Sequence, residues 1–94
     1  MTAPGRPARS ATPLPFVLVL AGRALFTSFF GKAEQARLGA RFSWTRAGAR
    51  RVTPALRPLL AEAEALVTTW DSPAFDATLT SVAPRLRMIA HCGG

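Results

Sequence analysis

The side chains that could react or hold a metal ion gather in the last four residues of this chain, His-Cys-Gly-Gly (91–94). His91 and Cys92 are its single histidine and single cysteine. A cysteine nucleophile needs a base that faces it, but adjacent residues of an extended chain point to opposite sides. The same geometry argues against a shared metal ion. We therefore expect no catalytic residue and no metal site in this chain, and a small buried thiol at Cys92.

Arginine side chains are candidates for binding nucleic acid, because the formal net charge is +7. Ten Lys or Arg residues precede residue 61, against Glu34 alone. A nucleic-acid interface normally gathers its basic residues on one face. Here they are dispersed, and the one local cluster, Arg46, Arg50 and Arg51, is interpreted as part of a solvated loop. We expect no nucleic-acid partner.

Four short apolar segments with helix-like segments between them must position these residues. The predicted strands are Phe16–Leu20, Arg41–Thr45, Ala65–Thr69 and Arg85–Ala90. The first is apolar throughout, which suits a strand covered on both faces, and the second alternates, which suits an edge strand. Strands alternating with helices predict a parallel sheet with right-handed crossovers. The expected fold is therefore α/β, a parallel-sheet, flavodoxin-like (Rossmann-like) three-layer domain, incomplete, with about four strands.

The predicted helices have recognisable ends. The first spans residues 24–38, with a break at Gly31 and an end at Gly39, a residue type that often follows the last helical turn. Its apolar face is predicted to hold Leu25, Phe29, Ala33, Ala36 and Leu38. The second begins at Thr53-Pro54 or Arg57-Pro58, because proline is favoured at the first helical position. The third is capped by Asp76 and ended by Pro84.

The length of 94 residues allows one small domain, here residues 16–94 after a flexible Pro/Arg-rich tail at residues 1–15. No apolar run approaches the roughly 20 residues of a membrane span, so no membrane partner is expected. The lone cysteine fits a reducing compartment, which favours the cytoplasm. The basic tail, the run FVLVL and the small residues near Ala21–Ala24 also resemble a secretory signal, so a secreted protein stays open.

Ligands of parallel sheets bind at the carboxyl ends of the strands, near the point where the strand order reverses. The predicted loops at these ends are Ala21–Arg23, Trp70–Pro73 and His91–Gly94. The last is the strongest candidate, because glycine lets a backbone approach a ligand closely. A plain turn would have the same composition.

The order of residues from Leu59 to Gly94 closely resembles the substrate-binding domain of the D-isomer-specific 2-hydroxyacid dehydrogenases. In that family a helix ending in A-E-A or A-D-A leads into a strand, as in LLAEAEALVTTW here. A second segment, A-P-x-L-(R/K)-x-I-A, leads into a glycine-containing loop, as in APRLRMIAHCGG. Between Phe16 and Arg57 the match is one of pattern only.

This resemblance implies an NAD- or NADP-dependent oxidoreductase that acts on the CH-OH group of 2-hydroxy acids. The substrate would be a small 2-hydroxy or 2-keto acid. Its carboxylate would be bound by backbone N–H groups at the positions of Cys92, Gly93 and Gly94. The sequence departs from many members of the family in having no G-V-G after the strand.

The resemblance also implies what this chain lacks. The family's acid/base histidine, its arginine and its glutamate belong to later segments, and no G-x-G-x-x-G cofactor motif occurs in the 94 residues. We therefore expect the first portion of a split substrate-binding domain, truncated before the NAD-binding domain and inactive alone. Full-length members are commonly homodimers. The alternative is a small secreted or basic α/β interaction protein without catalysis.

Overall fold

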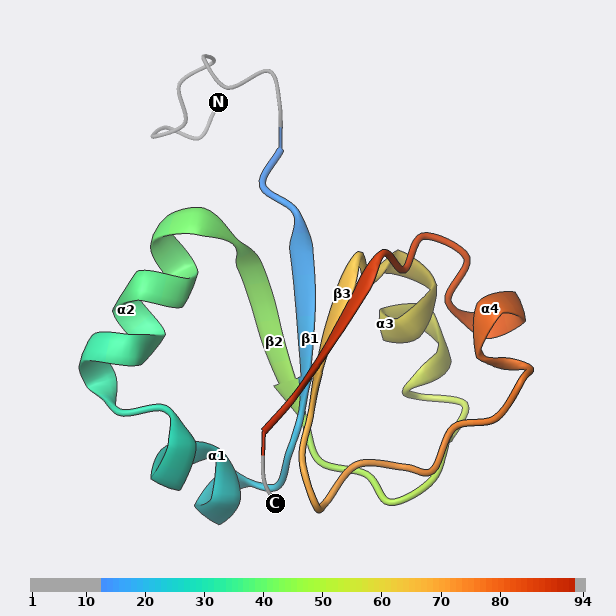
Figure 1. Ribbon diagram of the computed structural model, residues 1–94, viewed down its shortest axis with the longest axis horizontal. Coiled ribbons are helices and arrows are strands. Elements are labelled where there is room, and N and C mark those ends of the chain that lie inside the picture. The colour runs from blue at the N-terminus through green and yellow to red at the C-terminus, as the bar shows by residue number, and fades with distance from the viewer. Residues whose placement is uncertain (1–12, 93–94) are drawn as a thin grey trace.

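All four strands of the sheet run parallel, in the order β2-β1-β3-β4 (Figure 1). The structure, a computed structural model, describes residues 13–92. Its elements are, in chain order, β1 (Phe16–Leu20), α1 (Arg23–Phe29), α2 (Lys32–Arg41), β2 (Ser43–Ala47), α3 (Arg57–Glu62), β3 (Ala65–Thr68), α4 (Leu79–Val82) and β4 (Met88–His91). Helices α1 and α2 lie on one side of the sheet and α3 and α4 on the other. The predicted flavodoxin-like α/β fold with four parallel strands is confirmed.

The central strand β1 is buried on both faces, as its continuous apolar sequence predicts. Leu18 and Leu20 pack into one cluster with residues of α3, and Val17 and Val19 pack into a second cluster with Phe26 of α1. Residues 18–20 have no exposed surface at all. The strand therefore joins the two halves of the core through the sheet.

The first predicted helix is two helices separated at Gly31, as expected, but its predicted end at Gly39 is wrong. Helix α2 continues through Gly39 to Arg41, and the N–H of Phe42 closes it by donating to the Leu38 carbonyl at 2.8 Å. Leu38 and Phe42 both pack against the core cluster around Val17. This packing outweighs the cost of a glycine inside a helix, which is about 1 kcal/mol. Strand β2 consequently begins two residues later than predicted.

Of the predicted apolar face of these helices, Leu38 packs against the core, but Ala33 and Ala36 are exposed. Phe26 is the buried residue of α1, and α2 has none. The Phe26 ring lies between Phe30 and Trp44, with centroids 5.2 and 5.3 Å away. Stacked rings gain attraction beyond their burial, so the aromatic residues, and not the alanines, decide how the helix rotates toward the sheet.

On the other face the helices are short. Helix α3 begins at Arg57 with Pro58 in its first turn, which confirms one of the two predicted starts. Helix α4 is a single turn, and Asp76 does not cap it as predicted. Its Oδ1 atom accepts hydrogen bonds from the Thr78 backbone N–H (2.8 Å) and Oγ1 (2.6 Å), in the turn before the helix. These donors lower the pKa of Asp76.

Strand β4 lies later in the chain than predicted. A turn closed by the Leu86 N–H and the Ala83 carbonyl occupies the expected start, and pairing begins where Met88 faces Ala65 of β3. His91, predicted as loop, is therefore part of the strand. Within residues 13–92, β4 pairs with β3 alone, and its Met88 and Ile89 are 59% and 50% exposed.

Candidate functional site

The strand order reverses between β1 and β3, and a pocket of about 280 Å³ lies at that end of the sheet. Its lining residues follow three different strands: Gly22 follows β1, Gly48 to Arg50 follow β2, and Asp71 follows β3. In open parallel sheets this is the position where ligands bind. Its position at the carboxyl ends of the strands therefore makes this pocket the first candidate for a ligand site.

The Asp71 carboxylate is held by two neighbouring loops. Its Oδ2 atom accepts a hydrogen bond from the Gly22 backbone N–H at 3.2 Å, and its Oδ1 atom lies 3.2 Å from Nη2 of Arg50. The Arg50 side chain is 80% exposed, so water screens this ion pair and it contributes little stability. The pair nevertheless sets one negative and one positive group side by side at the mouth of the pocket.

Two hydroxyl groups fix the loop after β3 onto the end of β1. The Leu20 carbonyl accepts hydrogen bonds from Thr69 Oγ1 and Ser72 Oγ, both at 2.8 Å. Ser72 Oγ also accepts the Thr69 N–H, and Thr69 Oγ1 accepts the Asp71 N–H. Short hydroxyl side chains often satisfy loop backbone in this way. Because Thr69 is only 4% exposed, Asp71 is positioned by a buried network.

Close approach of the loops explains the glycines at this end of the sheet. A Cβ atom on Gly48 would lie 3.3 Å from the Gly22 Cα and 3.4 Å from the Ala21 carbonyl oxygen. A Cβ atom on Gly22 would lie 3.0 Å from Oδ2 of Asp71. Arg46 adds a further link, since its Nη1 atom donates to the Ala21 carbonyl at 3.0 Å. Any larger residue at Gly48 has to displace backbone.

The three arginines of the predicted cluster therefore have three different roles. Arg46 bonds to backbone, Arg50 pairs with Asp71, and Arg51 lies with its neighbours around a second pocket on the α3/α4 face. The interpretation of the cluster as a solvated loop holds for the exposed Arg50 and Arg51, but Arg46 belongs to β2. Sequence reasoning had named the loops containing Gly22 and Asp71 but missed Gly48 and Arg50. The glycine in the loop after β2 was the available signal.

His91 and Cys92 lie at the carboxyl end of β4, at the same end of the sheet as this pocket. The Nδ1 atom of His91 is 2.9 Å from Oγ1 of Thr68, so the imidazole forms a hydrogen bond with the neighbouring strand. The backbone N–H of Cys92 donates to the Thr68 carbonyl at 2.8 Å. Of the three residues predicted to bind a substrate carboxylate, Cys92 thus uses its N–H within the sheet. Gly93 and Gly94 lie outside the described residues.

Residues 13–92 contain neither a metal-binding cluster nor a helix that could span a membrane. No group of three or more His, Cys, Asp or Glu residues in that part of the chain is arranged to hold a metal ion. None of the helices formed there has the length and apolar character needed to cross a membrane.

Comparison with known proteins adds no relative. No model of a protein family matches this chain, and no curated protein matches it in sequence. A function must therefore be inferred from the residues, the fold, and the resemblance between residues 59–94 and the dehydrogenases.

Proposed function

We propose that this chain is part of the substrate-binding domain of an NAD- or NADP-dependent 2-hydroxyacid dehydrogenase. One observation carries the proposal: the described part of the segment that resembles this family, residues 59–92, runs from α3 through β3 and α4 to β4, a strand parallel to the other three, and Gly93 and Gly94 are the next residues in the sequence. Ligands of parallel sheets bind at the carboxyl ends of the strands. The ligand proposed is a small 2-hydroxy or 2-keto acid.

The substrate contact is assigned to backbone N–H groups. The N–H of Cys92 is bonded to Thr68, so the donors proposed for the carboxylate are those of Gly93 and Gly94. Glycine suits this role because the absence of a Cβ atom lets a ligand reach the backbone. The hydrogen bond of the Cys92 N–H to the Thr68 carbonyl then holds the chain to β3 at the residue before Gly93.

We expect no cofactor site among the residues of this chain. A nicotinamide cofactor supplies the hydride in this reaction class, and the carbonyl oxygen needs an acid. The 94 residues contain no G-x-G-x-x-G turn, and the imidazole of His91 is bonded to Thr68. We therefore expect the purified chain to bind substrate weakly and to show no NADH-dependent turnover of pyruvate or glyoxylate above a blank.

Amide NMR of the ¹⁵N-labelled chain tests the proposed contact. Pyruvate should shift the Gly93 and Gly94 amide signals saturably, and the Cys92 amide less, since it is already bonded. Acetone, which has the keto group without the carboxylate, should not shift them. If pyruvate and acetone act alike, or if only amides far from β4 respond, the loop is a plain turn and the proposal is wrong.

A variant at Gly93 sharpens the test. Gly93→Val places a branched side chain where the carboxylate must approach, and loss of a hydrogen bond to a charged group weakens binding about ten- to a hundredfold. Gly31→Ala, at an exposed position between α1 and α2, is the control and should leave pyruvate binding unchanged. A Gly93→Val chain that binds pyruvate within about twofold of the parent would contradict the assignment.

A second candidate is an α/β interaction protein without catalysis, secreted or basic. The exposed Met88 and Ile89 on a strand with one neighbour favour it, because such an edge can pair with another chain. Mass spectrometry of the protein recovered from cells separates the two proposals in part. Cleavage near Ala24 would support secretion, but it would remove the central strand β1, so the secreted product would not keep this fold. An intact amino terminus would support the cytoplasmic location expected for the dehydrogenase.

A further inference from the structure

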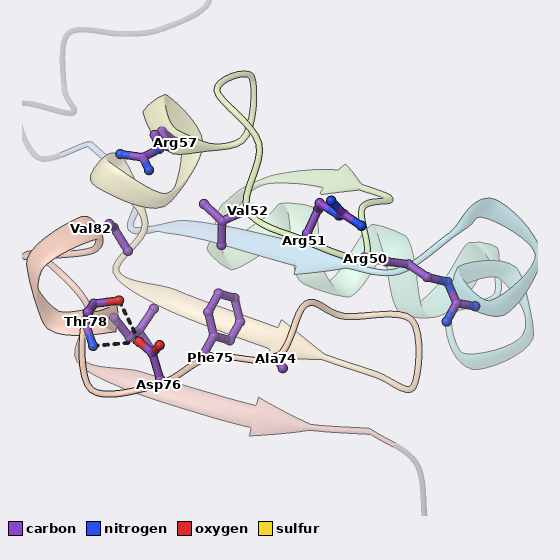
Figure 2. A pocket seen from close by; sticks show the side chains of 10 residues that line it. Arg50, Arg51, Val52, Arg57, Ala74, Phe75, Asp76, Thr78 and Val82 are labelled. Carbon is purple, nitrogen blue, oxygen red and sulfur yellow. Dashed lines mark hydrogen bonds between the residues drawn. The ribbon is translucent and has the colours of Figure 1, made fainter.

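A second and larger pocket, of about 390 Å³, lies on the α3/α4 side of the sheet (Figure 2). It is formed between the loop that follows β2 and the segment that leads from β3 into α4. Three arginines, Arg50, Arg51 and Arg57, belong to its lining. Known ligand pockets have volumes of about 300–1,000 Å³ and combine apolar walls with a few polar groups. This pocket has both features.

The wall of the pocket is apolar and belongs to the core. Val52, Phe75 and Leu79 line it, and each packs with its inner side against the cluster that contains Leu18 and Leu60. Figure 2 shows the Phe75 ring and Val52 in the middle of the pocket, with Arg57 to one side and Arg51 to the other. A flat apolar group can therefore lie against the ring while charged groups at its ends face the arginines.

The rim carries more positive than negative charge. Arg50 is paired with Asp71, but no carboxylate of residues 13–92 lies within 4.0 Å of a nitrogen of Arg51 or Arg57. The one carboxylate in the lining, Asp76, accepts both of its hydrogen bonds from Thr78. Two guanidinium groups are thus free to bind an anion.

We propose that this pocket binds an organic dianion, with one carboxylate or phosphate on Arg51, another on Arg57, and its apolar body against Phe75 and Val52 between them. Guanidinium groups suit such anions because they donate two parallel hydrogen bonds to a carboxylate or phosphate. The pocket lies beside the sheet and not at the loop after β4. The inference therefore goes beyond the proposed function and does not depend on it.

Amide NMR with four small probes tests the pocket. Terephthalate and 1,4-phenylene bisphosphate, in which a ring separates two anionic groups, should shift the amides of residues 50–52 and 74–79 saturably. Benzyl alcohol has the ring without the charge, and inorganic phosphate has the charge without the ring, so both should bind more weakly. The tighter of the two ring anions identifies the preferred anionic group.

Arginine variants test the charged contacts. Arg51→Gln and Arg57→Gln should each weaken binding of the better ring anion about tenfold, the scale of one hydrogen bond to a charged group. Both residues are exposed, so the variants should keep the parent spectrum outside the pocket. Arg37→Gln, an exposed change on α2 across the sheet, is the matched control and should leave binding unchanged.

Three results would overturn the proposal. Inorganic phosphate binding as tightly as 1,4-phenylene bisphosphate would show general attraction to a basic protein. An equal loss of affinity in Arg37→Gln would show the same. Saturable shifts confined to residues away from 50–52 and 74–79 would place the anion elsewhere.

Discussion

Strands β1 and β4 are both short, largely apolar segments, yet they have opposite environments. Strand β1 lies between β2 and β3 and has helices on both faces, and its residues 17–20 are buried. Strand β4 pairs only with β3, and three of its four residues are exposed. Local preference makes both segments extended, and their place in the sheet order decides how much each contributes to stability.

The face of the sheet that α1 and α2 cover has an apolar hollow near β4. Beside α2, Val67, Met88 and Ala90 line an apolar hollow of about 200 Å³, which Leu38 and Phe42 border from the helix side. Helices normally cover both faces of a parallel sheet. The α2 side of the sheet is therefore less completely covered beside β4 than over β1.

Alanine substitutions in the two strands should show the largest difference. Leu18→Ala removes a fully buried side chain and should lower the free energy of unfolding by about 2–5 kcal/mol. Ile89→Ala, at a half-exposed site of β4, should cost about 1 kcal/mol or less. Urea denaturation measures both. Similar losses would show that β4 is as well covered as β1 in solution.

A pair of glycine variants tests the close approach at the end of β1. Gly48→Ala brings a Cβ atom to 3.3 Å from backbone of Gly22, and overpacking of this kind typically costs about 1–3 kcal/mol. Gly39→Ala, inside α2 with its Cβ atom at an ordinary 3.6 Å from Trp44, should stabilise by up to about 1 kcal/mol. Thermal melts of the two variants should shift in opposite directions. A shared direction would refute the packing argument.

Lysine substitutions on β4 test whether the exposed edge leads to association. We expect the chain to be marginally stable and to associate as its concentration rises, because an unpaired edge with exposed apolar side chains can pair with another copy. Met88→Lys and Ile89→Lys should each reduce association, since lysine on an edge strand opposes pairing. Sedimentation velocity over a concentration series measures this. A monomeric parent with a sharp, concentration-independent thermal transition would contradict the expectation.

The smallest expected effect is on the pH dependence of stability, through Asp76 in the turn before α4. The pKa of Asp76 is lowered by the Thr78 donors, so its carboxylate stabilises the fold above the unfolded-state pKa of about 3.9. That contribution is lost as the pH falls through the folded-state pKa. Asp76→Asn keeps an acceptor but does not titrate, so the Tm difference between parent and variant should disappear in strong acid. A difference that persists there would exclude Asp76 as its source.

Patterns within single segments were enough to predict several features. The apolar run FVLVL indicated a strand covered on both faces, Gly31 indicated a break between helices, and Pro58 indicated a helix start. Each depends on backbone chemistry or local periodicity that acts over a few residues. The alternation of strands and helices then sufficed for the parallel α/β fold, because crossover rules leave few alternatives.

Contacts between distant segments decided the rest. Packing of the partly buried Leu38 and Phe42 against the core carries α2 past Gly39, and pairing with Ala65 moves the start of β4 to Met88. At the candidate site, Gly22, Arg50 and Asp71 meet only because three strands end at one edge of the sheet. Asp71 is 49 residues from Gly22 in the chain, and no short-range pattern encodes their contact. The sequence by itself determined which segments are strands and helices, and tertiary packing determined where they end and which loops meet.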